Sequence, residues 1–243
     1  MISVEPREYT RDGASFEGLA AFDPSWTGTR PGVLIVHDWM GVGPYVSRRA
    51  GEIAGLGYAA LAADIYGKGV RPASIEDAAL CANKYKEDRS LMRKHAAAAL
   101  DALKADPRVD PGRLAAMGYC FGGTVVLELA RSGAEAAGFV SFHGGLNTPA
   151  PEDARHIKGK VLVLHGADDP LVPTGEVLAF EEEMRKAGVD WQMTFYGSAV
   201  HAFTNRDAGN NPANGVAYNE KADRRSFEAM KAFFVEIFGQ ARG

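Results

Sequence analysis

The sequence is poor in cysteine and has neither a long apolar run nor a cluster of basic residues. Cys81 and Cys120 are its only two cysteines among 243 residues. That is too few for a disulfide framework, and two lone thiols fit a reducing cytoplasm. The longest apolar stretches, such as residues 33–36 and 161–164, have the length of a strand, whereas a membrane span needs about 20 residues. We therefore expect no membrane segment.

The charge balance argues against another class of partner. The chain has 27 basic and 31 acidic residues, a net charge of −4, and these basic residues form no Lys/Arg-rich run. Such a pattern favours neither nucleic acid nor an anionic membrane surface. Residues 1–6 lack the charged and then apolar segments of a signal peptide. The oligomeric state stays open between a monomer and a homodimer.

The order of the expected strands and helices indicates one domain over residues 1–243. A hydrophobic content of 46% and this length allow a large core. The pair Asp12-Gly13 predicts a hairpin between residues 7–10 and 15–22. Apolar runs then alternate with amphipathic patterns. The expected strands are 32–37, 58–63, 113–118, 139–142, 160–165 and 190–196, and the expected helices 44–56, 74–105 in one or two pieces, 122–132, 174–187 and 220–238.

This alternation predicts an α/β fold with a mostly parallel sheet, helices on both faces and an N-terminal antiparallel hairpin. In such sheets ligands bind beyond the carboxyl ends of the strands. We therefore look for chemistry in the loops that leave the strands.

The strongest motif is a glycine-flanked cysteine between the strand 113–118 and the helix that follows. Residues 118–122 read Gly-Tyr-Cys-Phe-Gly, the spacing of a nucleophile turn with Cys120 in place of the usual serine. Residues two before and two after the nucleophile approach each other there, so side chains would clash. The helix N-terminus favours a thiolate. The alternative is a buried cysteine in a structural turn.

A thiol nucleophile needs a base, and the base needs an orienting acid. His201 stands in the loop after the strand 190–196, and Asp168 and Asp169 stand in the loop after the strand 160–165. We favour Asp169, because it directly precedes the segment that leads into the next helix, although either aspartate could be a turn former.

Three other histidines, His37, His143 and His165, also end strands. They could line the site, but a structural role is the better interpretation. No ligand-spaced motif is present, so we expect neither a metal nor a cofactor.

An oxyanion would be held by the amide of Phe121 and by a second amide from the loop after the strand 32–37. Trp39 and Met40 are the candidates for that second donor. Asp38, in the same loop, carries a carboxylate that could influence the protonation of the thiol.

These residues resemble the dienelactone hydrolase family of the α/β-hydrolase superfamily over nearly the whole chain. The resemblance lies in residues 37–41, 118–123, 166–173 and 201–203. It implies an α/β-hydrolase fold, a Cys120–His201–Asp169 triad, and hydrolysis of small-molecule carboxylic esters or lactones through a thioester. It also supports Asp169 over Asp168. Phosphate triesters are implied as side substrates.

The chain departs from the family pattern at the residues expected to contact the substrate. Asp38 stands where the family has a glutamate that helps to form the thiolate. Asn205, with Arg206 next to it, stands where the family has an arginine for the substrate carboxylate. A second such arginine has no clear match, and Arg71, Arg89 and Arg93 are candidates. Tyr119 and Phe203 complete the residues predicted to bind substrate or tune the thiol.

Two other functions remain open at this stage. A thiol-dependent acyltransferase would use the same triad with a nucleophile other than water. A non-catalytic ligand-binding protein on the same fold would be expected to have lost part of the triad, and all three members are present.

Overall fold

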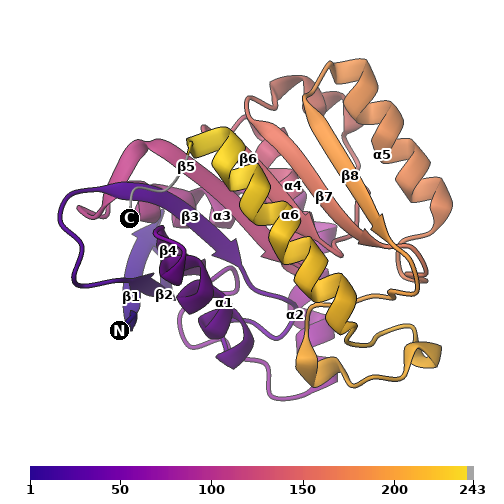
Figure 1. The fold of residues 1–243 in the computed structure, drawn as a ribbon, viewed down its shortest axis with the longest axis horizontal. Coiled ribbons are helices and arrows are strands. Elements are labelled where there is room, and N and C mark those ends of the chain that lie inside the picture. Colours follow the sequence, from indigo (N-terminus) through magenta and orange to yellow (C-terminus); the bar gives the residue numbers. More distant parts are fainter. Residues whose placement is uncertain (240–243) are drawn as a thin grey trace.

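One eight-stranded sheet organises the computed structural model, which describes residues 1–239 (Figure 1). Its strand order is β1-β2-β4-β3-β5-β6-β7-β8. The first two strands pair antiparallel with each other, β2 pairs antiparallel with β4, and all further neighbours are parallel. The strands are β1 Ser3–Arg11, β2 Ala14–Phe22, β3 Arg30–Val36, β4 Ala59–Ala63, β5 Val109–Tyr119, β6 Gly138–Phe142, β7 Lys160–Gly166 and β8 Trp191–Tyr196.

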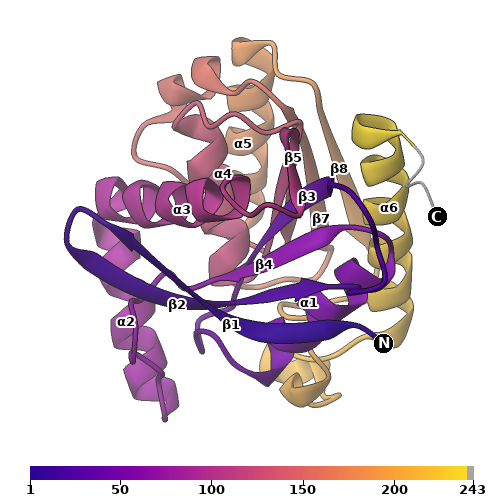
Figure 2. The ribbon, with the colours of Figure 1, turned by 90° about the vertical axis from the view of Figure 1, so that its left-hand side faces the viewer.

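The helices cover both faces of this sheet, as expected. Helices α1 and α6 lie on one face, and α3, α4 and α5 on the other (Figure 2). The helices are α1 Pro44–Gly55, α2 Ile75–Glu87, α3 Arg89–Lys104, α4 Phe121–Arg131, α5 Thr174–Ala187 and α6 Glu220–Phe238. The stretch 74–105 forms two helices because Asp88 ends α2, and its side chain then accepts the amide hydrogen of Leu91 at 2.9 Å to begin α3.

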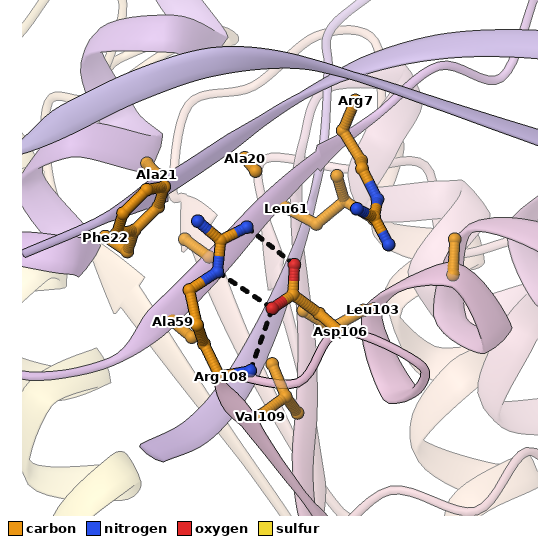
Figure 3. Close-up of a pocket in the computed structure, with 12 residues that line it drawn as sticks. Arg7, Ala20, Ala21, Phe22, Ala59, Leu61, Leu103, Asp106, Arg108 and Val109 are labelled. Atoms are coloured by element: carbon orange, nitrogen blue, oxygen red, sulfur yellow. Dashed lines mark hydrogen bonds and ion pairs between the residues drawn. The ribbon is translucent and has the colours of Figure 1, made fainter. Parts of the chain in front are cut away.

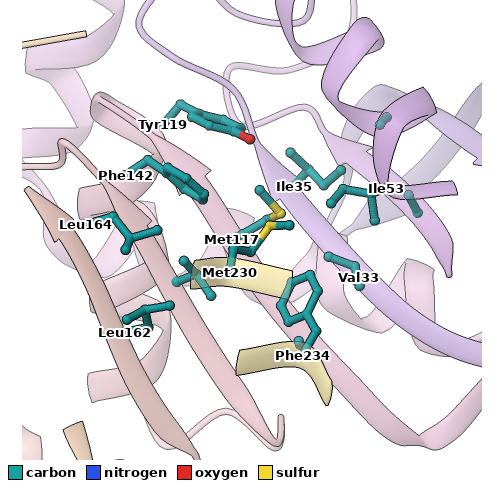
Figure 4. Packing of buried hydrophobic residues seen from close by; sticks show 14 of the residues in the cluster. Val33, Ile35, Ile53, Met117, Tyr119, Phe142, Leu162, Leu164, Met230 and Phe234 are labelled. Atoms are coloured by element: carbon teal, nitrogen blue, oxygen red, sulfur yellow. The ribbon is translucent and has the colours of Figure 1, made fainter. Parts of the chain in front are cut away.

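The buried strands place alternate side chains on opposite faces of the sheet. In β3, Val33 and Ile35 belong to the core under α1 and α6, together with Met230. Figure 4 shows this core from close by. Leu34 and Val36 belong to the core under α3 and α4. Because both faces are covered, the strand is apolar at every position from 33 to 36 rather than at every second one.

The N-terminal hairpin has the predicted two-residue turn. Arg11 pairs with Ala14, and Asp12 and Gly13 between them have φ angles of 49° and 80°. Two consecutive positive φ angles characterise the turn that matches the right-handed twist of the flanking strands. The prediction is confirmed, although both strands extend beyond the expected bounds.

The two ends of the parallel strands offer very different amounts of space. At the amino end of β5, Arg108 donates two side-chain hydrogen bonds to Asp106 and lies over the ring of Phe22 (Figure 3), and the two pockets beside it hold about 10 and 160 Å³. At the carboxyl end a cavity of about 730 Å³ opens. Within residues 1–239, no helix combines the length and the apolar character that crossing a bilayer requires.

Candidate active site

Cys120 occupies a strained turn between β5 and α4. Its φ and ψ angles are 54° and −116°, a conformation that non-glycine residues rarely adopt. A Cβ atom on Gly118 would lie 2.2 Å from the carbonyl oxygen of Gly122, and one on Gly122 would lie 2.3 Å from the carbonyl oxygen of Val36. Only glycine fits at either position. The predicted crowding around Cys120 is confirmed, and the turn places Cys120 in the wall of the cavity.

His201 connects the thiol to a carboxylate. Its Nε2 atom lies 3.0 Å from Sγ of Cys120, and its Nδ1 atom lies 2.8 Å from Oδ2 of Asp169. The other oxygen of Asp169 accepts the amide hydrogen of Leu171 at 2.8 Å, which fixes the carboxylate. Asp168, the alternative acid, is exposed and takes no part in this contact. The loops after β5, β7 and β8 thus bring the three predicted side chains together at one edge of the sheet.

The charge of His201 is set by its two neighbours. Burial lowers the pKa of the imidazole, but the adjacent Cys120 sulfur and the Asp169 carboxylate favour the protonated ring and raise its pKa overall to about 10. A cationic imidazole beside a sulfur atom favours the thiolate form of that sulfur. The arrangement suits a nucleophilic cysteine.

One of the two candidates for the second oxyanion donor is already engaged. The amide of Met40 donates a hydrogen bond of 2.9 Å to Oδ1 of Asp38. That bond leaves the amide of Trp39 as the candidate in this loop. Phe121 is the first residue of α4, so its amide has no acceptor within the helix. Trp39, Met40, Phe121 and Asp38 all line the cavity.

The cavity wall mixes apolar side chains with a few polar groups. Its residues come from the loops after β3, β5, β6, β7 and β8 and from helices α1 to α5. Met40, Ile75 and Leu171 are large apolar side chains that are exposed at this wall. Glu176 on α5 also lines it, and its carboxylate accepts the amide hydrogen of Asn147 at 3.0 Å. Such a wall binds a small, partly apolar molecule.

Three residues predicted to contact the substrate lie away from this cavity. The ring of Tyr119 is fully buried and stacks on Phe142. Phe203 is also fully buried, with its ring against His143. The guanidinium of Arg206 lies over the ring of Tyr218. These positions do not support direct substrate contact, because the side chains pack into neighbouring structure instead of facing the cavity.

Of the three candidate arginines, Arg89 alone is part of the cavity wall. Its guanidinium donates to the amide oxygen of Asn147 at 2.9 Å. Arg71 lies outside the cavity wall, with its guanidinium 3.6 Å from the buried carboxylate of Asp64. Arg93 pairs with Glu128 and with Asp153. Arg89 is therefore the cation of this set that a bound molecule can reach.

Of the other strand-end histidines, His37 and His165 lie outside the cavity wall and His143 lies in it. His37 accepts the amide hydrogen of Ile65, and burial lowers the pKa of its ring to about 4. Within residues 1–239, no three His, Cys, Asp or Glu side chains converge as ligands for a metal ion.

The ring centroid of His143 lies 5.4 Å from that of His201. Sequence reasoning favoured a structural role for His143 and overlooked Tyr45 and Thr204 beside it.

Comparison with known proteins agrees with this geometry. The model of the dienelactone hydrolase family matches residues 16–238. The structure named m3DLH is 44% identical with a TM-score of 0.93, over 98% of this chain and 99% of that one. A dienelactone hydrolase-like promiscuous phosphotriesterase from metagenomic libraries is 40% identical with a TM-score of 0.92, over the same shares of the two chains. A putative carboxymethylenebutenolidase of Aquifex aeolicus is 26% identical and covers 82% of this chain and 86% of its own length.

The family match covers most of the chain, and the fold of m3DLH agrees with that of this chain over nearly the whole length of both. The chain belongs to the dienelactone hydrolase family and is an ester and lactone hydrolase with the α/β-hydrolase fold.

Proposed function

We propose that this enzyme hydrolyses small carboxylic esters and lactones through a thioester on Cys120. The supporting observation is the position of the His201 ring, with one nitrogen 3.0 Å from the sulfur and the other 2.8 Å from the carboxylate of Asp169. A base held between a nucleophile and an orienting acid is the arrangement that acyl transfer to an enzyme side chain requires.

In the first half of the reaction the sulfur of Cys120 attacks the carbonyl carbon. The carbonyl electrons move onto oxygen, and the amides of Phe121 and Trp39 stabilise that charge. Losing one such donor typically costs about 2.7–4 kcal/mol of barrier. When the tetrahedral intermediate collapses, the carbon–oxygen bond to the leaving group breaks. His201 gives its proton to the departing alcohol or enolate, and a thioester remains.

In the second half a water molecule attacks this thioester. His201, now neutral, takes a proton from the water while Asp169 keeps the ring in the correct tautomer. The carbon–sulfur bond breaks, the acid leaves, and the sulfur and the protonated ring are restored. Each half thus moves one proton through the same imidazole.

The cavity favours a substrate with an apolar part and room for a negative charge. Met40, Ile75 and Leu171 offer apolar contact, whereas Lys86 and Arg89 are cations in the same wall. We propose esters with an aromatic or short aliphatic group, and lactones carrying a carboxylate that reaches Arg89. Activated phosphate triesters are proposed side substrates, because the 40% identical relative is described as a promiscuous phosphotriesterase.

We also propose that residues 1–243 form a single domain and that the enzyme works in a reducing compartment such as the cytoplasm. The single sheet supports the first statement. The two free cysteines support the second, because a nucleophilic thiol must stay reduced.

A panel of nitrophenyl esters and lactones tests the proposal on wild type, Cys120→Ala and Cys81→Ala. Cys81 lies on α2 and serves as the matched control for losing a thiol. We expect turnover by the wild type and by Cys81→Ala, and turnover at the background rate by a folded Cys120→Ala. Retained ester hydrolysis in Cys120→Ala would refute the assignment.

A further inference from the structure

His143 follows β6 and joins the two segments that carry the nucleophile and the base. Its Nδ1 atom accepts the amide hydrogen of Cys120 at 3.1 Å, which the carbonyl oxygen of Phe142 shares at 3.0 Å, and its Nε2 atom lies 2.7 Å from the hydroxyl oxygen of Thr204. Thr204 stands three residues after His201 in the same loop. Because the Cys120 amide can only donate, Nδ1 carries no hydrogen, and the hydrogen on Nε2 is donated to Thr204.

Neighbouring groups keep this bridge in place. His143 is 1% exposed and has a φ angle of 40°, a strained conformation that persists only when the surroundings enforce it. The Thr204 hydroxyl lies 2.7 Å from the hydroxyl of Tyr45. Arg49 donates to the carbonyl oxygen of Thr204 at 2.8 Å and to Asp223 at 2.6 Å. These buried hydrogen bonds restrict the positions of the groups that they join.

Both nitrogens of His143 are thus used in bonds to the protein, so the ring has no free nitrogen with which to exchange a proton with substrate. Burial lowers its pKa well below the usual value, and the nearby His201 acts in the same direction. The ring therefore stays neutral and adds no second positive charge beside the His201 imidazole.

The contact between Cys120 and His201 depends on two loops that leave different strands, β5 and β8. We propose that His143 is a positioning residue that sets the distance between Sγ of Cys120 and Nε2 of His201, through its bonds to the Cys120 amide and the Thr204 hydroxyl. The inference rests on the thioester mechanism proposed above. An error of about 1 Å in such a distance can cost on the order of 100-fold in rate.

Four variants separate positioning from packing. His143→Phe keeps an aromatic ring and loses both bonds. His143→Asn keeps a carbonyl oxygen that can accept the Cys120 amide hydrogen. Thr204→Val keeps the shape and loses the hydroxyl. Ser141→Ala is the matched control, because Ser141 lies buried on β6 and its hydroxyl has no hydrogen-bond partner within residues 1–239.

For His143→Phe we expect kcat to fall about 10- to 100-fold, with KM for a nitrophenyl ester nearly unchanged. Iodoacetamide should alkylate Cys120 more slowly at neutral pH in this variant, because the His201 ring no longer lies at hydrogen-bonding distance from the sulfur. Thr204→Val should show a smaller loss of the same kind, His143→Asn should recover most of kcat, and Ser141→Ala should match wild type.

The proposal is overturned if His143→Phe melts at a lower temperature yet keeps the wild-type kcat and alkylation rate. It is equally overturned if Thr204→Val is indistinguishable from Ser141→Ala, a comparison that stands even if His143→Phe does not fold. Alkylation needs no substrate. It therefore tests the bridge even if the wild type hydrolyses none of the esters, a result that would count against the proposed function alone.

Discussion

The carboxylate of Asp38 accepts the amide hydrogen of Met40 at 2.9 Å, two residues along the same loop. This bond holds the loop that contains Trp39, the proposed second oxyanion donor. Burial raises the pKa of Asp38. Asp38 is the acceptor that shapes this loop, and its charge also interacts with that of His201, so its influence on the thiol stays a prediction.

Replacing Asp38 by Asn should therefore do less harm than replacing it by Ala. Asparagine keeps an oxygen for the Met40 amide, so we expect kcat within a few-fold of wild type. Alanine leaves that amide without its acceptor, a loss of about 1–3 kcal/mol for a buried group, and kcat should fall by roughly tenfold or more. Steady-state kinetics with one nitrophenyl ester measures kcat for the wild type and for both variants. Equal losses in the two variants would show that the charge of Asp38 matters more than its hydrogen bond.

Stability should depend on pH through His201. Its pKa rises from an ordinary 6.5 to about 10 in the folded protein, so folding favours the protonated ring. The stabilisation is present in full below pH 6.5 and is lost as the pH rises toward about 10. The urea midpoint of the wild type should fall across this window more steeply than that of His201→Gln. Parallel curves for the two proteins would contradict the raised pKa.

Arg89 should discriminate between neutral and anionic substrates. Its guanidinium lines the cavity and donates to the neutral amide oxygen of Asn147. Arg89→Met should raise KM about tenfold for a lactone that carries a carboxylate, which corresponds to about 1.4 kcal/mol. KM for a neutral nitrophenyl ester should hardly change. A loss of the same size for both substrates would assign Arg89 a structural role.

The fold followed from local patterns that the sequence displays directly. The Asp12-Gly13 turn and the continuous apolar run of residues 33–36 predicted the hairpin and a buried parallel strand. The start of β5 was missed. Residues 109 and 110 also pair with β3, but Pro111 and Gly112 follow them and the pairing shifts register there. Proline and glycine are typical of turns, so this extension could not be seen without the neighbouring strand.

The triad residues could be found because each one follows a strand at the same edge of the sheet. The same reasoning reached His143 and favoured a structural role, but it could not identify the partner Thr204, which lies 61 residues away. Tyr119 and Phe203 stand next to or near triad residues in sequence, yet both point into the core. Closeness in sequence to a catalytic residue does not predict which side of the loop a side chain occupies.

The central claim is that an acyl group passes through the sulfur of Cys120. Wild type quenched with acid during turnover of nitrophenyl acetate, digested and analysed by mass spectrometry tests it most directly. We predict one acetyl group on the peptide that contains Cys120 and none on the peptide that contains Cys81. An enzyme that turns over rapidly and carries no acetyl group on Cys120 at any quench time, or carries it on another residue, would contradict this account.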